Sequence, residues 1–223
     1  LSMFVSNPGP GGGAGGALQL SVVNPVPVLT SLNVASIVAG SLTGPLLVTA
    51  NGAAFVAGAV VRVDGIPRTT TLFNVNTVVF SLQPSDAAFG RTLTIDVQNQ
   101  APGGGLSGAL SIVVQNPVPT ATNLAPSSAA TGSSTPVVVQ VSGTQFNPST
   151  FVEVDGVPRA TSAITSTTCE FVMNPADLVV AGPRAARVVN PAPAGGASAA
   201  LTFDVLNPIP SIATVAPATV VAT

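Results

Sequence analysis

Apolar and polar residues alternate along many short segments of the chain, which is the period-two pattern of β-strands with one buried face. Between positions 93 and 98 every second residue is apolar, and we expect three of them to face a core: Leu93, Ile95 and Val97. The residues between them are expected to face water: Thr94, Asp96 and Gln98. The same alternation occurs at 110–114 and 139–141. Since no segment has sustained helical periodicity, we predict an all-β fold.

Two sequence motifs recur at a nearly fixed spacing. Asn-Pro-Val-Pro at 24–27 returns at 116–119 and, as Asn-Pro-Ile-Pro, at 207–210, which are spacings of 92 and 91 residues. Val-Asp-Gly-x-Pro-Arg at 63–68 returns at 154–159. Self-similarity at a fixed period is the signature of a repeat architecture, so the chain is predicted to be a tandem array.

The spacing divides the chain into four parts: the C-terminal part of a preceding repeat (1–27), two complete repeats (28–119 and 120–210), and the first strand of a following repeat (211–223). We expect the chain to be a window onto a longer array. The competing interpretation is that the two partial repeats complete one another, or other copies, by strand donation. Together they hold about 40 residues, too few to rebuild one repeat by themselves.

Turn residues separate the strand segments within each repeat. Asp64-Gly65 and Asp155-Gly156 suit two-residue hairpin turns, because glycine accepts a positive φ and aspartate tolerates it. The glycine-rich stretches at 10–13, 101–105 and 192–196 lie between strand segments and are expected to be hairpin tips, since no helix and no Lys-Ser/Thr follow them as in a phosphate loop. About seven short strands per repeat predict an immunoglobulin-like β-sandwich.

The recurring motifs also carry a family resemblance. They comprise Asn-Pro-Val-Pro (24–27, 116–119), Gly-x-x-Phe (52–55, 143–146), Val-Asp-Gly-x-Pro-Arg (63–68, 154–159) and Asn-x-x-Pro-Gly-Gly-Gly (99–105). This pattern resembles the IPT/TIG domain, the immunoglobulin-like fold of plexins and some transcription factors that is also common in bacterial surface proteins. The resemblance implies the fold, but that fold supports adhesion, glycan binding, DNA contact and plain spacing.

Composition excludes several classes of function. Only 6% of residues are charged, against about 25% in an average globular domain. The six basic residues are scattered arginines and the net charge is −2, so a nucleic-acid-binding surface is not expected. Pro, Gly, Asn, Ser or Thr interrupt every apolar run, whereas a membrane-spanning helix needs about 20 consecutive apolar residues. We therefore expect no membrane span in this segment.

The residues needed for catalysis are also missing. Without histidine there is no Ser-His or Cys-His pair, and with a single cysteine there is neither a zinc site nor an intrachain disulfide. Glu153 and Asp155 are the only carboxylates close together in sequence, and the turn already accounts for Asp155. The sequence therefore predicts that the protein is not an enzyme and has no catalytic, cofactor-binding or metal-binding residues.

A cysteine, two arginines and four phenylalanines are the remaining candidates for a special role. Cys169 aligns with Val78 and is expected to be a small buried hydrophobe rather than an activated thiol, because its neighbour is Glu170 and not a base. Arg68 and Arg159 could be recognition arginines, but we expect them to pair locally with the turn aspartate or to lie at a solvated strand end. Four phenylalanines recur at core-like positions: Phe55, Phe80, Phe146 and Phe171.

Linkers and surface together suggest a function. Two prolines in each Asn-Pro-x-Pro segment restrict φ and favour a short, stiff joint. A surface with few charges can pack against copies of itself at little desolvation cost. We therefore expect a bacterial extracellular or cell-surface protein that self-assembles into a filament, sheath or stalk, with copies of itself as partners. The alternative is a spacer or carbohydrate-binding accessory module that recognises surface glycans; an adhesion receptor fits less well without disulfides or N-glycosylation sequons.

Overall fold

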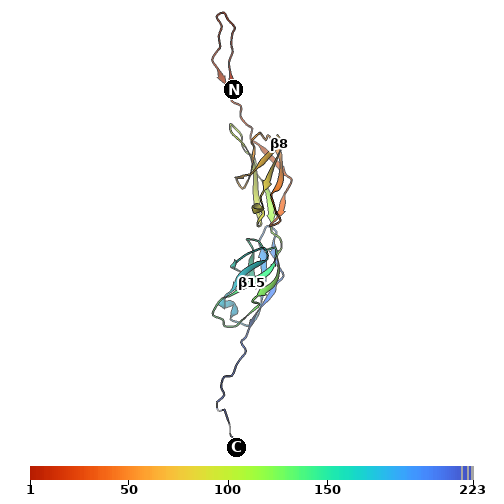
Figure 1. Cartoon of the computed structure of the whole chain (residues 1–223), viewed down its shortest axis with the longest axis vertical. Coiled ribbons are helices and arrows are strands. Elements are labelled where there is room, and N and C mark those ends of the chain that lie inside the picture. Colours follow the sequence, from red (N-terminus) through yellow and green to blue (C-terminus); the bar gives the residue numbers. More distant parts are fainter. Residues whose placement is uncertain (217, 220, 222–223) are drawn as a thin grey trace. The chain divides into compact units, whose positions relative to one another are not determined.

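The computed structural model describes residues 1–216, 218–219 and 221, which form two compact units, Leu1–Gln115 and Asn116–Thr223. Each unit is built from β-strands, with one short 3-10 turn between two of them (Figure 1). No helix in the described part of the chain is both long enough and apolar enough to cross a membrane.

The first unit contains a hairpin followed by a two-layer sandwich. The hairpin pairs β1 (Ser2–Met3) with β2 (Leu18–Gln19). One sheet of the sandwich has the order β3 (Val28–Leu32), β5 (Leu46–Ala53), β9 (Thr77–Leu82), β8 (Thr70–Asn74). The other has the order β4 (Ser36–Val38), β12 (Leu110–Gln115), β10 (Arg91–Asn99), β6 (Val60–Val63), β7 (Ile66–Pro67), with β11 (Gly105–Leu106) also paired to β10. The 3-10 turn η1 (Pro84–Ala87) lies between β9 and β10.

The second unit repeats this topology. Its smaller sheet has the order β13 (Thr120–Ala125), β15 (Val137–Thr144), β19 (Thr168–Met173), β18 (Thr161–Ser162). Its larger sheet has the order β14 (Ser128–Ala130), β22 (Leu201–Leu206), β20 (Gly182–Asn190), β16 (Phe151–Val154), β17 (Val157–Arg159), with β21 (Gly196–Ala197) paired to β20. The turn η2 (Pro175–Leu178) corresponds to η1. The described residues after β22 contain no strand, and the rest of 211–223 lies outside the described residues.

Each complete repeat has ten strand segments rather than the expected seven or so, because its first strand is divided between the two sheets. In the first sandwich β3 pairs antiparallel with β5, and the chain then crosses to the other layer, where β4 pairs parallel with β12. Two-residue strands such as β7 and β11 account for the other additions. The chain is a tandem of immunoglobulin-like β-sandwiches.

The core lies between the layers and follows the alternation predicted from the sequence. Leu93, Ile95 and Val97 are fully buried, and the four recurring phenylalanines are buried as well: Phe55, Phe80, Phe146 and Phe171. Asp96 was expected to face water, but only 9% of this residue is exposed. Arg62 on the neighbouring strand β6 covers it, donating from Nε to Oδ1 at 2.7 Å and from Nη2 to Oδ2 at 2.9 Å.

Both Asp-Gly pairs form the predicted hairpin turns. Asp64 and Gly65 have φ values of 51° and 78°, and Asp155 and Gly156 have 51° and 79°, which are the left-handed conformations that such a turn requires. The carboxylate of each aspartate also accepts a backbone N–H from the adjacent strand. The glycine-rich stretches lie at hairpin tips, as expected, since antiparallel strands flank each of them.

Candidate functional site

Each complete repeat binds the Asn-Pro-x-Pro linker that precedes it at its glycine-rich hairpin tip. In the first repeat the Asn24 N–H donates to Pro102 O at 2.7 Å, and the Asn24 carbonyl accepts from the Gly104 N–H at 2.7 Å. The Asn24 side chain adds a third bond, from Nδ2 to Gln100 O at 2.7 Å. Residues almost 80 positions apart in sequence are therefore joined in a short parallel bridge.

The second repeat holds its own linker in the same way. Three bonds match those of the first repeat: Asn116 N–H to Pro193 O at 2.8 Å, Gly195 N–H to Asn116 O at 2.8 Å, and Asn116 Nδ2 to Pro191 O at 2.7 Å. We term the receiving loop, 99–105 in the first repeat and 190–196 in the second, the linker socket. Its chemistry is that of backbone carbonyls and amides that recognise one asparagine.

A second asparagine forms the base of each socket. Asn99 and Asn190 are each 1% exposed, and each directs its Nδ2 donors to the linker and to the end of a strand on the other sheet. The acceptors of Asn99 are Pro25 O at 2.9 Å and Ala54 O at 2.7 Å, and those of Asn190 are Pro117 O at 2.9 Å and Gln145 O at 2.8 Å. These buried amides are satisfied only when the linker is in place, which makes the linker part of the domain that follows it.

Glycine is required in the socket because the backbone turns back closely on itself. Gly104 and Gly195 both have φ near +69°, and a Cβ on Gly104 would lie 2.5 Å from Asn99 O. A Cβ on Gly103 would lie 2.7 Å from Asn24 O of the bound linker. The recurrent glycines are therefore needed for the close approach of linker and loop, and not for flexibility alone.

The recurring arginines have structural partners, but not the predicted ones. Arg68 pairs with Asp86 in η1, and Arg159 pairs with Asp177 in η2, each from Nη2 to Oδ1 at 2.6 Å. The expected partner, the turn aspartate, instead accepts a backbone N–H: Asp64 Oδ1 takes that of Thr94 at 2.8 Å. Local pairing is confirmed, whereas the predicted choice of partner is wrong because the long arginine side chain reaches the 3-10 turn.

Cys169 is completely buried in the second core, as predicted from its alignment with Val78. Burial raises the pKa of its thiol to about 11, so the thiolate that would act as a nucleophile is not formed near neutral pH. Among the described residues no group of three or more His, Cys, Asp or Glu is placed to hold a metal ion.

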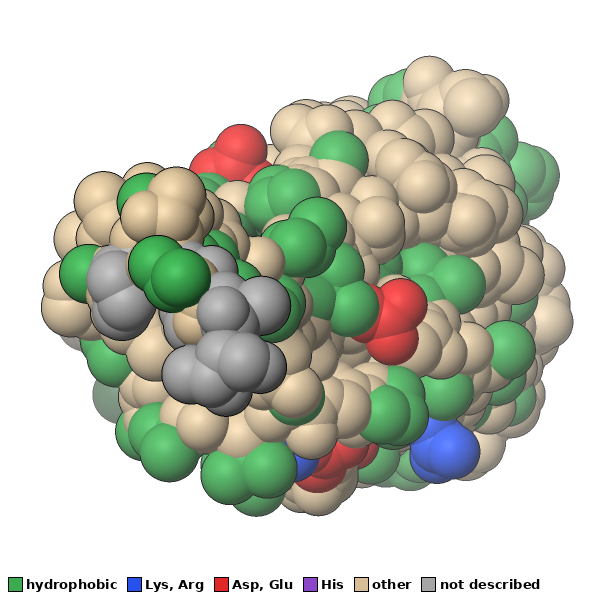
Figure 2. Space-filling view, turned by 90° about the horizontal axis from the view of Figure 1, so that it is seen from below, with side chains coloured by type: hydrophobic (Ala, Val, Ile, Leu, Met, Phe, Trp, Pro, Cys, Tyr) green, Lys and Arg blue, Asp and Glu red, His purple; other side chains and the backbone are tan. Residues whose placement is uncertain are grey.

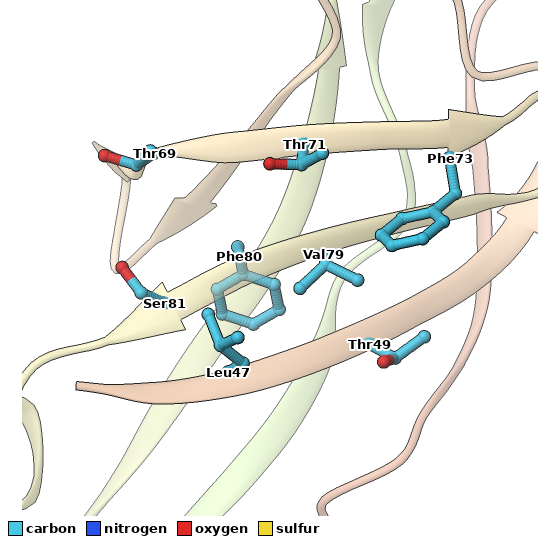
Figure 3. A pocket seen from close by; sticks show the side chains of 8 residues that line it. All are labelled: Leu47, Thr49, Thr69, Thr71, Phe73, Val79, Phe80 and Ser81. Atoms are coloured by element: carbon cyan, nitrogen blue, oxygen red, sulfur yellow. The ribbon is translucent and has the colours of Figure 1, made fainter.

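A shallow groove of about 590 Å³ lies on the outer face of the smaller sheet of the first repeat (Figure 3). Leu47 and Phe73 are about two-thirds exposed along it. Cross-strand neighbours Thr49, Val79 and Thr71 form a row across β5, β9 and β8. The rest of the lining is Thr69, Phe80 and Ser81. The corresponding face of the second repeat carries Glu170 opposite Gln140, so it is charged where the groove of the first repeat is not.

Neither the linker socket nor Phe73 is predicted from the sequence. The motifs predict a stiff joint and a hairpin tip separately, and they do not predict that the two bind each other. The recurrence of an asparagine immediately before each glycine-rich stretch, at 7, 99 and 190, was the available signal. Phe73 carries no repeat signal, because the second repeat has Ile164 in its place.

No protein-family model and no curated protein sequence matches the chain. Solved structures that match it include the plexin A4 extracellular region (13% identity, 82% of this chain and 18% of that chain, TM-score 0.32). Another is the ICAM-5 D1–D4 ectodomain fragment (15% identity, 87% of this chain and 52% of that chain, TM-score 0.34). A third is SGBP-B of the Bacteroides ovatus mixed-linkage glucan utilization locus, in complex with a mixed-linkage heptasaccharide (15% identity, 88% of this chain and 50% of that chain, TM-score 0.29). The chain thus spans about half or less of these proteins, and likenesses this distant carry no information about its function.

Proposed function

We propose that this protein is a non-catalytic, extracellular structural module whose stiff tandem domains assemble into a filament, sheath or stalk. The observation that carries the proposal is the linker socket. In both complete repeats the asparagine of the linker is fixed to the following domain by three hydrogen bonds, and a buried asparagine binds the next carbonyl. With two prolines also restricting φ, the linker retains little conformational freedom.

The charge distribution supports self-association. All six charged side chains of the first complete repeat take part in ion pairs within it: Arg62–Asp96, Arg68–Asp86 and Arg91 with both Asp64 and Asp86. On the face shown in Figure 2, hydrophobic and uncharged polar side chains cover most of the surface, with a few separate acidic and basic groups. Packing such surfaces together requires little removal of water from ions, so copies of the chain are the proposed partners.

The same features favour a surface location. Thr, Ser, Asn, Gln and Val take the exposed positions that Lys and Glu occupy in most soluble proteins. The motif pattern described above supports kinship with IPT/TIG repeats of bacterial surface proteins. We infer no enzymatic activity and no nucleic-acid partner, because five of the six arginines form ion pairs and the carboxylates form no cluster among the residues described.

Negative-stain electron microscopy of the native protein tests this function. We expect ordered filaments whose axial repeat is a small multiple of one domain length, in the absence of denaturant or added ligand. Separate short rods at every concentration would contradict the proposal. Small-angle scattering of the same samples measures whether particle length grows with protein concentration, as it must for a polymer.

The groove on the first repeat supports one alternative, a carbohydrate-binding accessory module. Phe73 offers an exposed ring, and hydroxyls of Thr49, Thr71 and Ser81 lie along the same groove, an arrangement suited to the apolar face and hydroxyls of a sugar. A glycan array tests this function, with Phe73→Ala as the variant that should lose binding. Its matched control is Ile164→Ala at the same position of the second repeat, which should bind as the wild type does.

A further inference from the structure

The first hairpin contains a third copy of the socket loop. Asn7–Gly13 aligns with 99–105 and 190–196, and its backbone matches theirs in part. Gly11 has φ 83°, as Gly103 has 69°, whereas Gly12 and Gly13 lack the positive φ that Gly104 and Gly105 have. A Cβ on Gly12 would lie 2.8 Å from the Asn7 carbonyl carbon, and the equivalent separation at Gly104 is 2.9 Å. The loop therefore shares the sequence and the close backbone contacts of the two occupied sockets, and it differs from them in the φ of its last two glycines.

This third socket is open. Its linker-binding groups, by correspondence with the other two, are Pro8 O, Pro10 O, the Gly12 N–H and the Nδ2 of Asn7. Within the described ranges 1–216, 218–219 and 221, no hydrogen bond reaches any of these four groups. The backbone N–H of Asn7 donates to Gly13 O within the loop. The socket thus presents the whole set of donors and acceptors that Asn24 and Asn116 satisfy elsewhere.

The chain also contains a third linker that occupies no socket. Asn207-Pro208-Ile209-Pro210 repeats the sequence of the two bound linkers, and Ile209 is 93% exposed. The equivalent residues of the bound linkers, Val26 and Val118, pack beside the last glycine of their sockets, since a Cβ on Gly196 would lie 3.5 Å from Val118. The main chain of Asn207 has no partner among the described residues, and its side chain accepts one bond, from Thr131 at 3.4 Å.

We propose that the open socket, Asn7–Gly13, binds the Asn207–Pro210 linker of a second copy of this chain, joining copies head to tail. The contacts would be those of the occupied sockets: Asn207 N–H to Pro10 O, Gly12 N–H to Asn207 O, Asn207 Nδ2 to Pro8 O, and Asn7 Nδ2 to Pro208 O. This inference rests on the proposed assembly and gives it a polarity and a specific junction.

The apolar residues next to the socket favour a protein partner. Leu1, Met3 and Val5 are 60–77% exposed, whereas the aligned residues of the first complete repeat form its core: Leu93, Ile95 and Val97. The residues that follow the third linker supply apolar side chains for this face, since Ile212 and Val215 are 83% and 69% exposed. Burying both sets would add hydrophobic stabilisation to the hydrogen bonds of the junction.

Two variants test the junction by complementation. Gly12→Ala blocks the socket but leaves the linker intact, because the added Cβ would collide with the carbonyl oxygens of Asn7 and Pro8. Asn207→Asp removes the Nδ2 donor but leaves the socket intact. In analytical ultracentrifugation the wild type should form chains that lengthen with concentration, each variant alone should be monomeric, and the two variants mixed should form dimers and nothing longer.

The matched control is Gly9→Ala, since no atom lies within 4 Å of a Cβ there and the complete repeats carry Ala101 and Ala192 at this position. It should assemble as the wild type does. A labelled synthetic peptide of residues 203–216 should bind once per Asn207→Asp chain, and its own Asn207→Asp form should bind at least about tenfold more weakly.

The outcomes separate this proposal from the proposed function. If Gly12→Ala assembles like the wild type and the peptide does not bind, the junction is wrong while self-assembly stands. If the peptide binds the socket but the wild type forms no chains, the linker recognition stands and the filament function fails. Circular dichroism of each variant, compared with wild type, shows whether the two sandwiches remain folded.

Discussion

Asn190 joins three separate parts of the second repeat through one side chain. Its Nδ2 donates to Pro117 O of the linker and to Gln145 O after β15, and its Oδ1 accepts from the Thr150 hydroxyl. The residue is 1% exposed, and Thr150 is buried beside it. A buried carbonyl without a donor costs about 1–3 kcal/mol.

We therefore expect Asn190→Ala to lower the free energy of unfolding of the second repeat by about 3 kcal/mol, because two carbonyls lose their donor. Urea denaturation followed by circular dichroism measures this change. Asn123→Ala is the matched control, since Asn123 is exposed on the same repeat, and its effect should stay within about 0.5 kcal/mol. Equal effects of the two substitutions would contradict the role of Asn190.

Cys169 makes the second repeat sensitive to alkaline pH. Its thiol pKa is raised by burial to about 11, from an ordinary value of 9.0, so the folded state holds its proton more tightly than the unfolded state. The stabilisation is complete below pH 9 and is lost as the pH rises towards 11. In thermal melts the Tm should fall across this range more steeply in the wild type than in Cys169→Val, which carries the residue of the first repeat. If the Tm of the wild type and that of Cys169→Val fell equally with pH, groups other than Cys169 would govern the alkaline transition.

The same burial predicts the reactivity of the thiol. At pH 8 a thiol reagent should label Cys169 only as fast as the second repeat opens, because neither the sulfur nor a thiolate is accessible in the folded state. Denaturant should raise the labelling rate in step with the unfolded population. Immediate labelling of the native protein would show that the second core is open in solution.

Strands β6 and β10 carry a pair of unlike charges whose signs are exchanged in the second repeat. Arg62 on β6 lies opposite Asp96 on β10, whereas the equivalent pair in the second repeat is Glu153 opposite Arg187. The sign of the charge has been exchanged between strands while the opposition of charges has been kept. Directly opposed unlike charges stabilise a strand pair, and like charges destabilise it.

Reversing the pair in the first repeat should therefore be tolerated. Arg62→Glu alone places two carboxylates opposite one another and should lower the Tm of the first repeat by several degrees. The double variant Arg62→Glu, Asp96→Arg should recover most of that loss, because it recreates the arrangement of the second repeat. A double-mutant cycle in differential scanning calorimetry measures the coupling between the two side chains. Purely additive effects would show that the two charges do not interact.

The strands could be predicted from sequence because each carries its own signal. Alternation placed Leu93, Ile95 and Val97 in the core, and Asp64-Gly65 marked a hairpin turn without reference to any distant residue. Contacts across the fold had no such local signal. In a tandem repeat every position recurs with the same spacing, so the recurrence of Asn24 and of Gly104 does not reveal that they touch. Arg68 likewise has two aspartates within reach, and only the folded backbone decides between them.

At the scale of the whole molecule, the scarcity of unpaired charge determines how assembly responds to salt. Salt screens attraction between exposed charges and has little effect on apolar and uncharged polar contacts. Raising sodium chloride from about 0.1 M to about 1 M should leave the concentration at which the protein assembles nearly unchanged, and sulfate should lower it. Light scattering measures this concentration. Dissolution of the assemblies in high sodium chloride would show that ion pairs hold them together.

The position of each linker ahead of its domain has a consequence for synthesis. The ribosome makes Asn116 before any other part of the second repeat, and strands β20 and β22, which flank the socket, come last. Each domain thus closes on a segment already present, and does not depend on the repeat that will follow. A chain emerging from the ribosome or from a secretion channel amino end first can therefore fold one repeat at a time, which limits the length of unfolded polypeptide exposed to aggregation or proteases at any moment.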